Sequence, residues 1–218
     1  MNVKLIGITA PSNDHKSAED LIVYMARVSN PSNQNTTQGN DKLIRYLIKN
    51  QHWSPFEMVS VVMEINTTRD IARQMLRHRS FSFQEFSQRY ADPTKDLSFE
   101  LRKARLQDNK NRQNSIETDD DELQNKWNLM QQTIVNNAEH AYNWAIENGI
   151  AKEQARTVLP EGNTQSKLYM NGTLRSWIHY CQLRMENGTQ KEHMEVAKAC
   201  WDIIAKQFPN VVTALEQQ

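Results

Sequence analysis

Apolar residues recur along the chain at two spacings, every second position as in strands and every third or fourth position as in helices. The segments Val3–Thr9 and Met58–Ile65 are rich in apolar residues and predict strands. The segments Ser17–Val28 and Asp41–Lys49 have the helical spacing, and Ser17 is a residue type that caps helices. The first part of the chain is therefore expected to contain both strands and helices.

Helical spacing dominates the C-terminal half. The segment Asp119–Asn148 predicts one long helix that ends at Gly149. Its apolar stripe is expected to consist of Leu123, Trp127, Met130, Ile134, Ala138, Ala141 and Ala145. Two final helices are predicted at Leu174–Met185 and Lys191–Phe208.

Four shorter segments lie between these elements. The segment Thr68–Arg79 predicts an amphipathic helix, and Ala151–Leu159 predicts a short helix before a proline. The segment Lys167–Met170 is expected to be extended, whereas the polar segment Leu97–Ser115 predicts no defined element.

The spacing as a whole predicts an α+β fold, in which several helices surround a small antiparallel or mixed sheet. Long helices are expected in the C-terminal half. No internal repeat, low-complexity linker or domain boundary interrupts the pattern. Residues 1–218 are therefore expected to form a single mixed domain.

The charges of the chain balance, with 26 Lys and Arg against 26 Asp and Glu in 218 residues. Bulk charge therefore gives no reason to expect a protein that binds nucleic acid. Cys181 and Cys200 are too few for a disulfide framework, and no apolar run is long enough to span a membrane. The N-terminal segment has neither a basic region nor a small-residue cleavage site, so a soluble cytoplasmic protein is expected.

Positive charge is nevertheless concentrated in one stretch, RHRSFSFQEFSQRY, from Arg77 to Tyr90. Arg69, Arg73 and Arg77 follow one another at a spacing of four, which places them on one face of the predicted helix. Solvated cations and core aromatic rings are the ordinary explanation for such residues. Two functional explanations stay open on composition alone, a surface for single-stranded nucleic acid and a closed site for a phosphorylated small molecule.

The histidines offer no recognisable metal site. None has a carboxylate three residues before it, and no His-Glu-x-x-His pair occurs. The pairs Glu139-His140 and Glu192-His193 are therefore expected on helix surfaces. With six glycines in the chain, no glycine-rich phosphate loop or dinucleotide-binding fingerprint can be placed.

Four sequence elements occur in a recognisable order over residues 52–184. They are His52-Trp53-Ser54-Pro55-Phe56-Glu57, then Arg77-His78-Arg79 with Ser87 and Arg89, then Ala155-Arg156-Thr157-Val158-Leu159-Pro160, and Arg175-Ser176-Trp177-Ile178-His179-Tyr180 with Leu183-Arg184. In this order they resemble the flavin-dependent thymidylate synthases. The signature of that family is Arg-His-Arg, seven residues, Ser, one residue, Arg.

The resemblance implies an FAD-dependent methyltransferase that converts dUMP to dTMP. The carbon would come from 5,10-methylenetetrahydrofolate, and the reducing electrons from NADPH through FAD. The resemblance also implies a homotetramer with active sites shared between chains, and it implies neither a metal nor a membrane partner. The basic stretch would then bind nucleotide phosphate and flavin, with a single-stranded nucleic-acid-binding protein as the alternative.

The resemblance also implies roles for residues by their place in these elements. The dUMP-binding set consists of Gln74, Arg77, Glu85, Ser87, Gln88, Arg89, Arg156 and Arg184. The FAD-binding set consists of Ser54, Arg77, His78, Arg79, Arg175 and His179. Arg184 is implied as the catalytic residue, since a guanidinium beside the uracil ring would stabilise negative charge as the C5 atom becomes nucleophilic.

Two further expectations concern the last helices. Cys181 and Cys200 lie among apolar residues, where a cysteine is more often a small buried side chain than a nucleophile. On one helix Arg175 and His179 share a face, whereas Arg184 lies on roughly the opposite face. Such a helix could serve two sites in different subunits, or it could break before Arg184.

Overall fold

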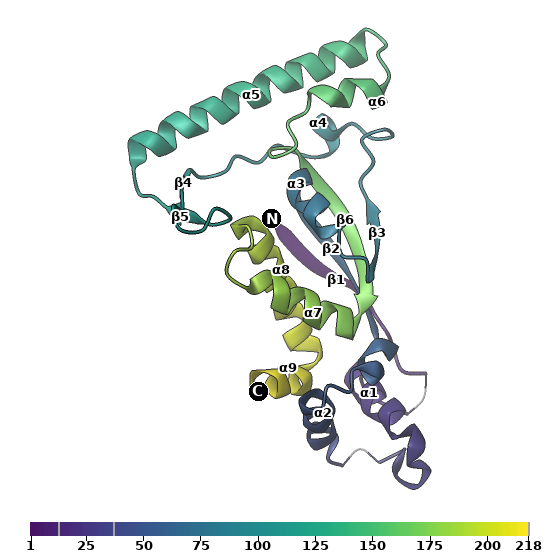
Figure 1. The fold of residues 1–218 in the computed structure, drawn as a ribbon. Helices are drawn as coiled ribbons and strands as arrows, with labels where there is room; N and C mark the ends of the chain where they lie inside the picture. The colour runs from purple at the N-terminus through teal and green to yellow at the C-terminus, as the bar shows by residue number, and fades with distance from the viewer. Residues whose placement is uncertain (13, 37, 218) are drawn as a thin grey trace.

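The computed structural model describes residues 1–12, 14–36 and 38–217. Four strands form an antiparallel sheet in the order β1-β2-β6-β3. Their bounds are β1 (Asn2–Ile8), β2 (Ser60–Thr68), β6 (Gln165–Thr173) and β3 (Phe81–Glu85). Helices lie along one face and at both ends of the sheet, with long helices in the C-terminal half (Figure 1), which confirms the predicted α+β fold.

The core lies between the sheet and two C-terminal helices, α7 (Leu174–Met185) and α8 (Lys191–Gln207). Val61 and Ile65 of β2 face this core and are fully buried, because alternate residues of a strand point to the same side. Trp177 of α7 donates a hydrogen bond of 3.0 Å from its indole Nε1 to the backbone oxygen of Val61. This bond holds α7 against the sheet and fixes which of its faces points outward.

A second group of helices packs at one end of the sheet, at the bottom of Figure 1. It consists of α1 (Ala18–Ala26), α2 (Asn40–Lys49) and α9 (Pro209–Glu216), with the short 3-10 turns η1 (Arg27–Ser29) and η2 (Pro31–Asn33) after α1. As predicted, Ser17 caps α1, and its side chain accepts a hydrogen bond from the backbone nitrogen of Asp20.

The helix α9 corrects the prediction of only two final helices. Pro209 ends α8 and at the same time occupies the first position of α9, where a proline is tolerated. The carboxylate of Glu19 in α1 accepts hydrogen bonds from the backbone nitrogen of Val211 at 2.9 Å and from Asn210 Nδ2 at 2.7 Å. The start of α9 is therefore held by a residue from the N-terminal part of the chain.

The long helix α5 (Asp121–Glu147) lies at the opposite end of the molecule from α9 (Figure 1). Its predicted apolar stripe is wrong at Trp127, Met130 and Ile134, which are 43%, 60% and 54% exposed, and right at Ala138 and Ala145, which are buried. The buried residues of this helix are Gln131, Val135, Ala138, Tyr142 and Ala145.

The reason is that an extended segment of the chain, not a large core, covers α5. Gln131 and Gln124 of α5 each exchange hydrogen bonds with backbone groups of this segment, at Arg102 and Ala104. The helix therefore turns its amide side chains inward, and part of its apolar surface remains exposed.

The helix α3 (Arg69–Met75) is shorter than the predicted segment Thr68–Arg79. The chain leaves the helix because the next residues form β3, whose Phe81 lies opposite Gly172 of β6. A side-chain carbon added at Gly172 would lie 2.4 Å from the Phe81 ring, so only glycine permits this close approach. Pairing between distant strands thus sets the end of α3.

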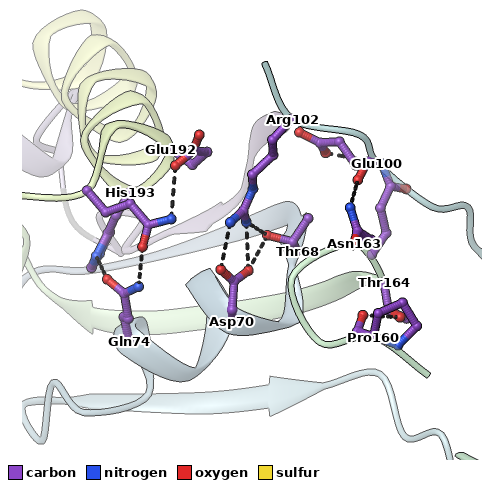
Figure 2. A network of polar contacts seen from close by, with 12 residues as sticks. Thr68, Asp70, Gln74, Glu100, Arg102, Pro160, Asn163, Thr164, Glu192 and His193 are labelled. Atoms are coloured by element: carbon purple, nitrogen blue, oxygen red, sulfur yellow. Dashed lines mark hydrogen bonds and ion pairs between the residues drawn. The ribbon is translucent and has the colours of Figure 1, made fainter. Parts of the chain in front are cut away.

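The polar stretch without a predicted element forms a hairpin of β4 (Arg105–Gln107) and β5 (Ser115–Glu117). Arg102, just before it, donates hydrogen bonds of 2.8 and 2.7 Å to the two carboxylate oxygens of Asp70 and one of 2.6 Å to Thr68 (Figure 2). The stretch is thereby fastened to the start of α3.

The remaining short elements are η3 (Ser54–Met58), α4 (Pro93–Asp96), α6 (Lys152–Ala155) and η4 (Arg156–Val158). The predicted short helix at Ala151–Leu159 is thus divided between α6 and a 3-10 turn. In the parts of the chain that the structure describes, no helix is both long and apolar enough to cross a membrane.

Candidate active site

A cleft of about 410 Å³ opens beside the first turns of α7. It is lined by Trp53, Glu57, Ser80, Arg175, Ser176, Ile178, His179 and Gln182. The 3-10 helix η3 (Ser54–Met58) forms one wall and α7 the other, and Arg175 donates a hydrogen bond of 2.6 Å to Glu57 Oε1 across the cleft. This ion pair joins the first and the last of the four sequence elements.

The residues predicted to bind FAD divide between this cleft and its surroundings. Arg175 and His179 line the cleft, and Ser54 begins the 3-10 helix that forms its wall. Arg77 and Arg79 are exposed where the chain turns from α3 to β3. His78 does not line this cleft.

His78 instead belongs to what we call the Arg184 cluster, formed by Arg184, His78, Tyr180 and His193. Arg184 Nε donates a hydrogen bond of 2.9 Å to His78 Nε2, and the His78 ring lies edge-on to Tyr180 with ring centroids 4.9 Å apart. Burial lowers the pKa of His78 to about 4, with the positive charges of Arg184 and His179 adding to the effect. His78 is therefore a neutral acceptor that holds the guanidinium.

Arg184 lies within the unbroken helix α7, which continues to Met185. The alternative of a helix break before Arg184 is therefore wrong. Arg175 and His179 line the cleft, whereas Arg184 points to His78, as expected for residues on different faces of one helix. The positive charges of Arg184 and His179 both contribute to the lowered pKa of His78.

The core member of this cluster, His193, contradicts its predicted place on a helix surface. His193 is fully buried, and its ring nitrogens lie 3.3 Å from Gln74 Oε1 and 3.1 Å from the Tyr180 hydroxyl. The helix α8 turns this side chain inward because Gln74 and Tyr180 supply the polar partners that a buried imidazole needs. A single sequence does not reveal these partners, which come from α3 and α7.

Another pocket, of about 300 Å³, lies beside α3. This arginine pocket, as we call it, is lined by Arg69, Arg73, Gln88, Arg156, Thr157, Leu159 and Glu161. Gln88 is buried, and its Nε2 has no hydrogen-bond partner among the described residues. A buried amide donor without a partner is costly, and here it lies beside three guanidinium groups.

Two carboxylates partly balance the arginine pocket. Arg73 pairs with Glu161, and Arg69 Nη1 lies 3.5 Å from Glu85 Oε1. Glu85 also accepts a hydrogen bond of 2.7 Å from Ser166. The pocket therefore combines exchangeable ion pairs with donors that can hold an anion.

The residues predicted to bind dUMP are only partly brought together. Gln88 and Arg156 line the arginine pocket, and Glu85 reaches it through Arg69. Arg89 lies at the rim, 3.7 Å from Glu153, whose backbone oxygen accepts a hydrogen bond from Arg156. The remaining members lie elsewhere: Ser87 is in the turn before Arg89, Arg77 is exposed after α3, Gln74 contacts His193 and Arg184 contacts His78.

Residues outside the predicted sets also line these sites. Arg69 and Arg73 form part of the arginine pocket, and the spacing of four along α3 was a signal that could have included them. Trp53 and Gln182 line the cleft beside α7 without a comparable signal.

The cysteine prediction is confirmed as far as burial is concerned. Cys181 and Cys200 are both fully buried free thiols, and burial raises the pKa of each well above its ordinary value. Neither lines the cleft or the arginine pocket. Nowhere in residues 1–12, 14–36 and 38–217 do three His, Cys, Asp or Glu side chains gather in a way that could hold a metal ion.

Comparisons with known proteins decide the family. A family model described as thymidylate synthase complementing protein matches residues 12–210. A probable flavin-dependent thymidylate synthase from Paramecium bursaria Chlorella virus 1 is 47% identical over 217 residues, which are 99% of each chain. The chain belongs to the flavin-dependent thymidylate synthase family. A member from Synechocystis sp. is 48% identical over 221 residues, 99% of this chain and 100% of that protein.

A solved structure of this family's fold is also similar. It is the crystal structure of a UMP/dUMP methylase, PolB from Streptomyces cacaoi, bound with 5-Br dUMP. The two chains superpose with a TM-score of 0.80 at 28% sequence identity, over 99% of this chain and 94% of the other. Membership of the family confirms the resemblance carried by the four sequence elements.

Proposed function

We propose that this protein is a flavin-dependent thymidylate synthase, which methylates dUMP to dTMP. In this proposal 5,10-methylenetetrahydrofolate supplies the carbon, and NADPH supplies reducing electrons through FAD. The observation that carries the proposal is the arginine pocket, where the predicted dUMP residues Gln88 and Arg156 lie together with Arg69 and Arg73. An enzyme of this class must hold a nucleotide phosphate, and this pocket offers the donors for one.

The phosphate of dUMP is assigned to the arginine pocket. Guanidinium groups bind phosphate through paired, charge-assisted hydrogen bonds. Glu161 and Glu85 pair with Arg73 and Arg69, and phosphate would replace or share these partners. The buried Nε2 of Gln88 would gain the acceptor that it lacks.

Arg184 is assigned the catalytic role on the uracil ring. Its guanidinium stays protonated and is held at Nε by the neutral His78, so the other nitrogens remain available to the substrate. Donors fixed beside a ring oxygen stabilise the negative charge that develops as the C5 atom becomes nucleophilic. The neutral state of His78 matters here, because a protonated imidazole could not accept this hydrogen bond.

The cleft beside α7 is assigned to FAD. Its lining combines a cation, Arg175, and the hydroxyls of Ser80 and Ser176 with the rings of Trp53 and His179, a donor set that suits a phosphate-bearing ring system. Bound flavin supplies reducing electrons, so that no cysteine thiolate has to add to the uracil ring. Arg175, His179 and the neighbouring Ser54 would hold it, with Arg77, His78 and Arg79 around the turn after α3.

The working unit is proposed to be a homotetramer of single-domain chains in the cytoplasm, with each site shared between chains. One chain places the cleft and Arg184 on different faces of α7, which supports a site completed by a second copy. The exposed apolar side chains Trp127, Met130 and Ile134 of α5 offer surface for assembly.

A visible absorption spectrum of the purified protein tests the proposal. We expect a yellow protein with the bands of oxidised flavin, a spectral change when dUMP is added, and dTMP formation with NADPH and methylenetetrahydrofolate. A protein that stays colourless after incubation with FAD, and binds single-stranded nucleic acid with a steep salt dependence, would contradict it.

A further inference from the structure

A row of hydrogen bonds leads from Glu192, at the start of α8, to Tyr180 in the core. Gln190 Nε2 donates to Glu192 at 3.0 Å, and Gln74 Nε2 donates to Gln190 Oε1 at 2.8 Å. Gln74 Oε1 lies 3.3 Å from His193 Nδ1, and His193 Nε2 lies 3.1 Å from the Tyr180 hydroxyl. Figure 2 shows Gln74 with its amide beside His193. The row connects residues from three helices and includes one predicted substrate residue, Gln74.

The carboxylate of Glu192 sets the direction of the whole row. Both of its oxygens are acceptors, and Arg105 of the β4–β5 hairpin holds it in an ion pair of 2.8 Å. Gln190 must therefore turn its nitrogen to Glu192 and its oxygen to Gln74. The reverse orientation would bring an amide oxygen against a carboxylate oxygen.

The same logic continues to the buried end of the row. Since Gln74 gives its nitrogen to Gln190, its oxygen faces His193 and needs a donor there. His193 therefore carries its proton on Nδ1 and accepts from the Tyr180 hydroxyl on Nε2. Burial, and then the positive charge of Arg184, lowers the pKa of His193 to about 3, so the ring is neutral and has a single N–H to place.

We propose that Glu192 and His193 are positioning residues that fix the amide orientation of Gln74 at the substrate site. The inference rests on the proposed function and on the sequence resemblance, which includes Gln74 among the residues that contact dUMP. A free glutamine side chain can turn its amide by half a rotation and exchange oxygen for nitrogen. With its oxygen held by His193 and one amide hydrogen held by Gln190, Gln74 presents its second amide hydrogen in a single direction.

This row also gives the polar hairpin a role at the active site. Arg105 lies in a stretch that none of the four sequence elements includes, yet it holds the carboxylate that orients Gln74. The hairpin thus acts on substrate binding through three intervening side chains, Glu192, Gln190 and Gln74, and without touching the substrate.

The tautomer of His193 is the direct test, read from the ring ¹⁵N chemical shifts of histidine-labelled holoenzyme. The signal is assigned with His193→Asn. We expect Nδ1 to carry the proton in the wild type. In Glu192→Gln, Arg105 donates to the oxygen of the new amide, so the nitrogen of that amide faces Gln190. Each hydrogen bond in the row then reverses its direction. The His193 ring is therefore expected to carry its proton on Nε2.

Glu195→Gln is the matched control, because Glu195 is exposed on the same helix and belongs to no part of the row. This variant is expected to keep the wild-type tautomer. A wild-type His193 protonated on Nε2, or a Glu192→Gln variant that keeps the wild-type tautomer, overturns the inference.

Calorimetric titration with dUMP is the second readout. Gln74→Ala and Glu192→Gln are each expected to weaken dUMP binding by about two- to tenfold, the range for a single neutral hydrogen bond. The double variant should lose little more than either single variant, since both changes remove the same contact. His193→Asn, whose amide can still donate to Gln74, should retain most of the affinity.

The two proposals fail in distinguishable ways. If Gln74→Ala leaves dUMP affinity unchanged, the assignment of Gln74 under the proposed function is wrong, and this inference is overturned with it. If Gln74→Ala weakens binding but Glu192→Gln binds dUMP like the wild type, the inference alone is overturned.

Discussion

The arginine pocket and the Arg184 cluster are both cationic, but their guanidinium groups have different partners. In the arginine pocket Arg73 pairs with Glu161, and Arg69 lies 3.5 Å from Glu85. Arg184 donates instead to the neutral His78, and none of the described carboxylates forms an ion pair with it. An ion pair with a carboxylate can be exchanged for one with phosphate, whereas a neutral partner leaves the positive charge free to act on the substrate. We therefore expect the arginine pocket to contribute to substrate binding and the Arg184 cluster to contribute to the chemical step.

Removing Arg184 is expected to have the largest effect. Arg184→Ala should lower the rate of dTMP formation at saturating dUMP by about 10²- to 10³-fold, the usual cost of losing one donor to a developing negative charge. Rapid-quench measurement of a single turnover gives this rate. Arg45→Ala, which removes an exposed arginine from α2, is the matched control. If Arg184→Ala bound dUMP weakly but kept the wild-type rate, Arg184 would have a binding role like the residues of the arginine pocket, and not a catalytic role.

Removing Arg156 should show the opposite pattern. Arg156→Ala is expected to weaken dUMP binding by about 10- to 150-fold, because a charge-assisted hydrogen bond to phosphate is lost. Arg89→Ala, at the rim, should act in the same direction. Titration calorimetry measures both affinities, and the rate at saturating dUMP should change less than in Arg184→Ala. Unchanged affinity in both variants would mean that phosphate does not bind in this pocket.

Mixed oligomers test whether the cleft and the Arg184 cluster of one chain serve different sites. We expect His179→Ala and Arg184→Ala to be nearly inactive alone. Co-expressed in equal amounts, they should regain about a quarter of the wild-type activity, because with random assembly that share of shared sites receives neither mutation. Native mass spectrometry verifies the mixing. Mixed oligomers without recovery, or an active monomer, would place both groups in one chain's site.

Replacing both cysteines should have the smallest effect. Cys181 and Cys200 are buried away from the cleft and the arginine pocket, and their raised pKa values keep them protonated. The double change to Ala is expected to leave the rate of dTMP formation within about threefold of the wild type, although lost packing lowers stability. If a folded double variant lost activity by about a thousandfold or more, the reaction would require a thiolate nucleophile. The arginine pocket and the Arg184 cluster would then not be sufficient for the chemistry.

Local pattern was enough to predict the elements whose own residues determine them. The strand β1, the helix α2 and the cap of α1 all follow from spacing and from Ser17. The end of α3 did not follow, because it depends on the fit of Phe81 against Gly172 in a strand far along the chain. The buried side of α5 did not follow either, because Gln124 and Gln131 face a backbone segment that supplies hydrogen bonds.

The candidate site also has a part that the sequence predicts and a part that depends on contacts between distant segments. Four sequence elements were sufficient to indicate the family and to name Gln88, Arg156 and Arg184. Their partners come from other parts of the chain, and the sequence pattern gives no sign of contacts such as that between Arg184 and His78. His193 shows this most clearly. A histidine next to a glutamate in a helix is expected on the surface, and only the fold places Gln74 and Tyr180 beside it as buried partners.

The bond between Glu19 and α9 has a consequence for the order in which the molecule is made. Glu19 Oε1 and the backbone nitrogen of Val211 are 192 positions apart along the chain. During synthesis α1 therefore leaves the ribosome long before the residues that satisfy its carboxylate exist. Contacts of such long range form late, so the surface of α1 and α2 that α9 covers stays open to solvent and to chaperones until nearly the whole chain has been translated.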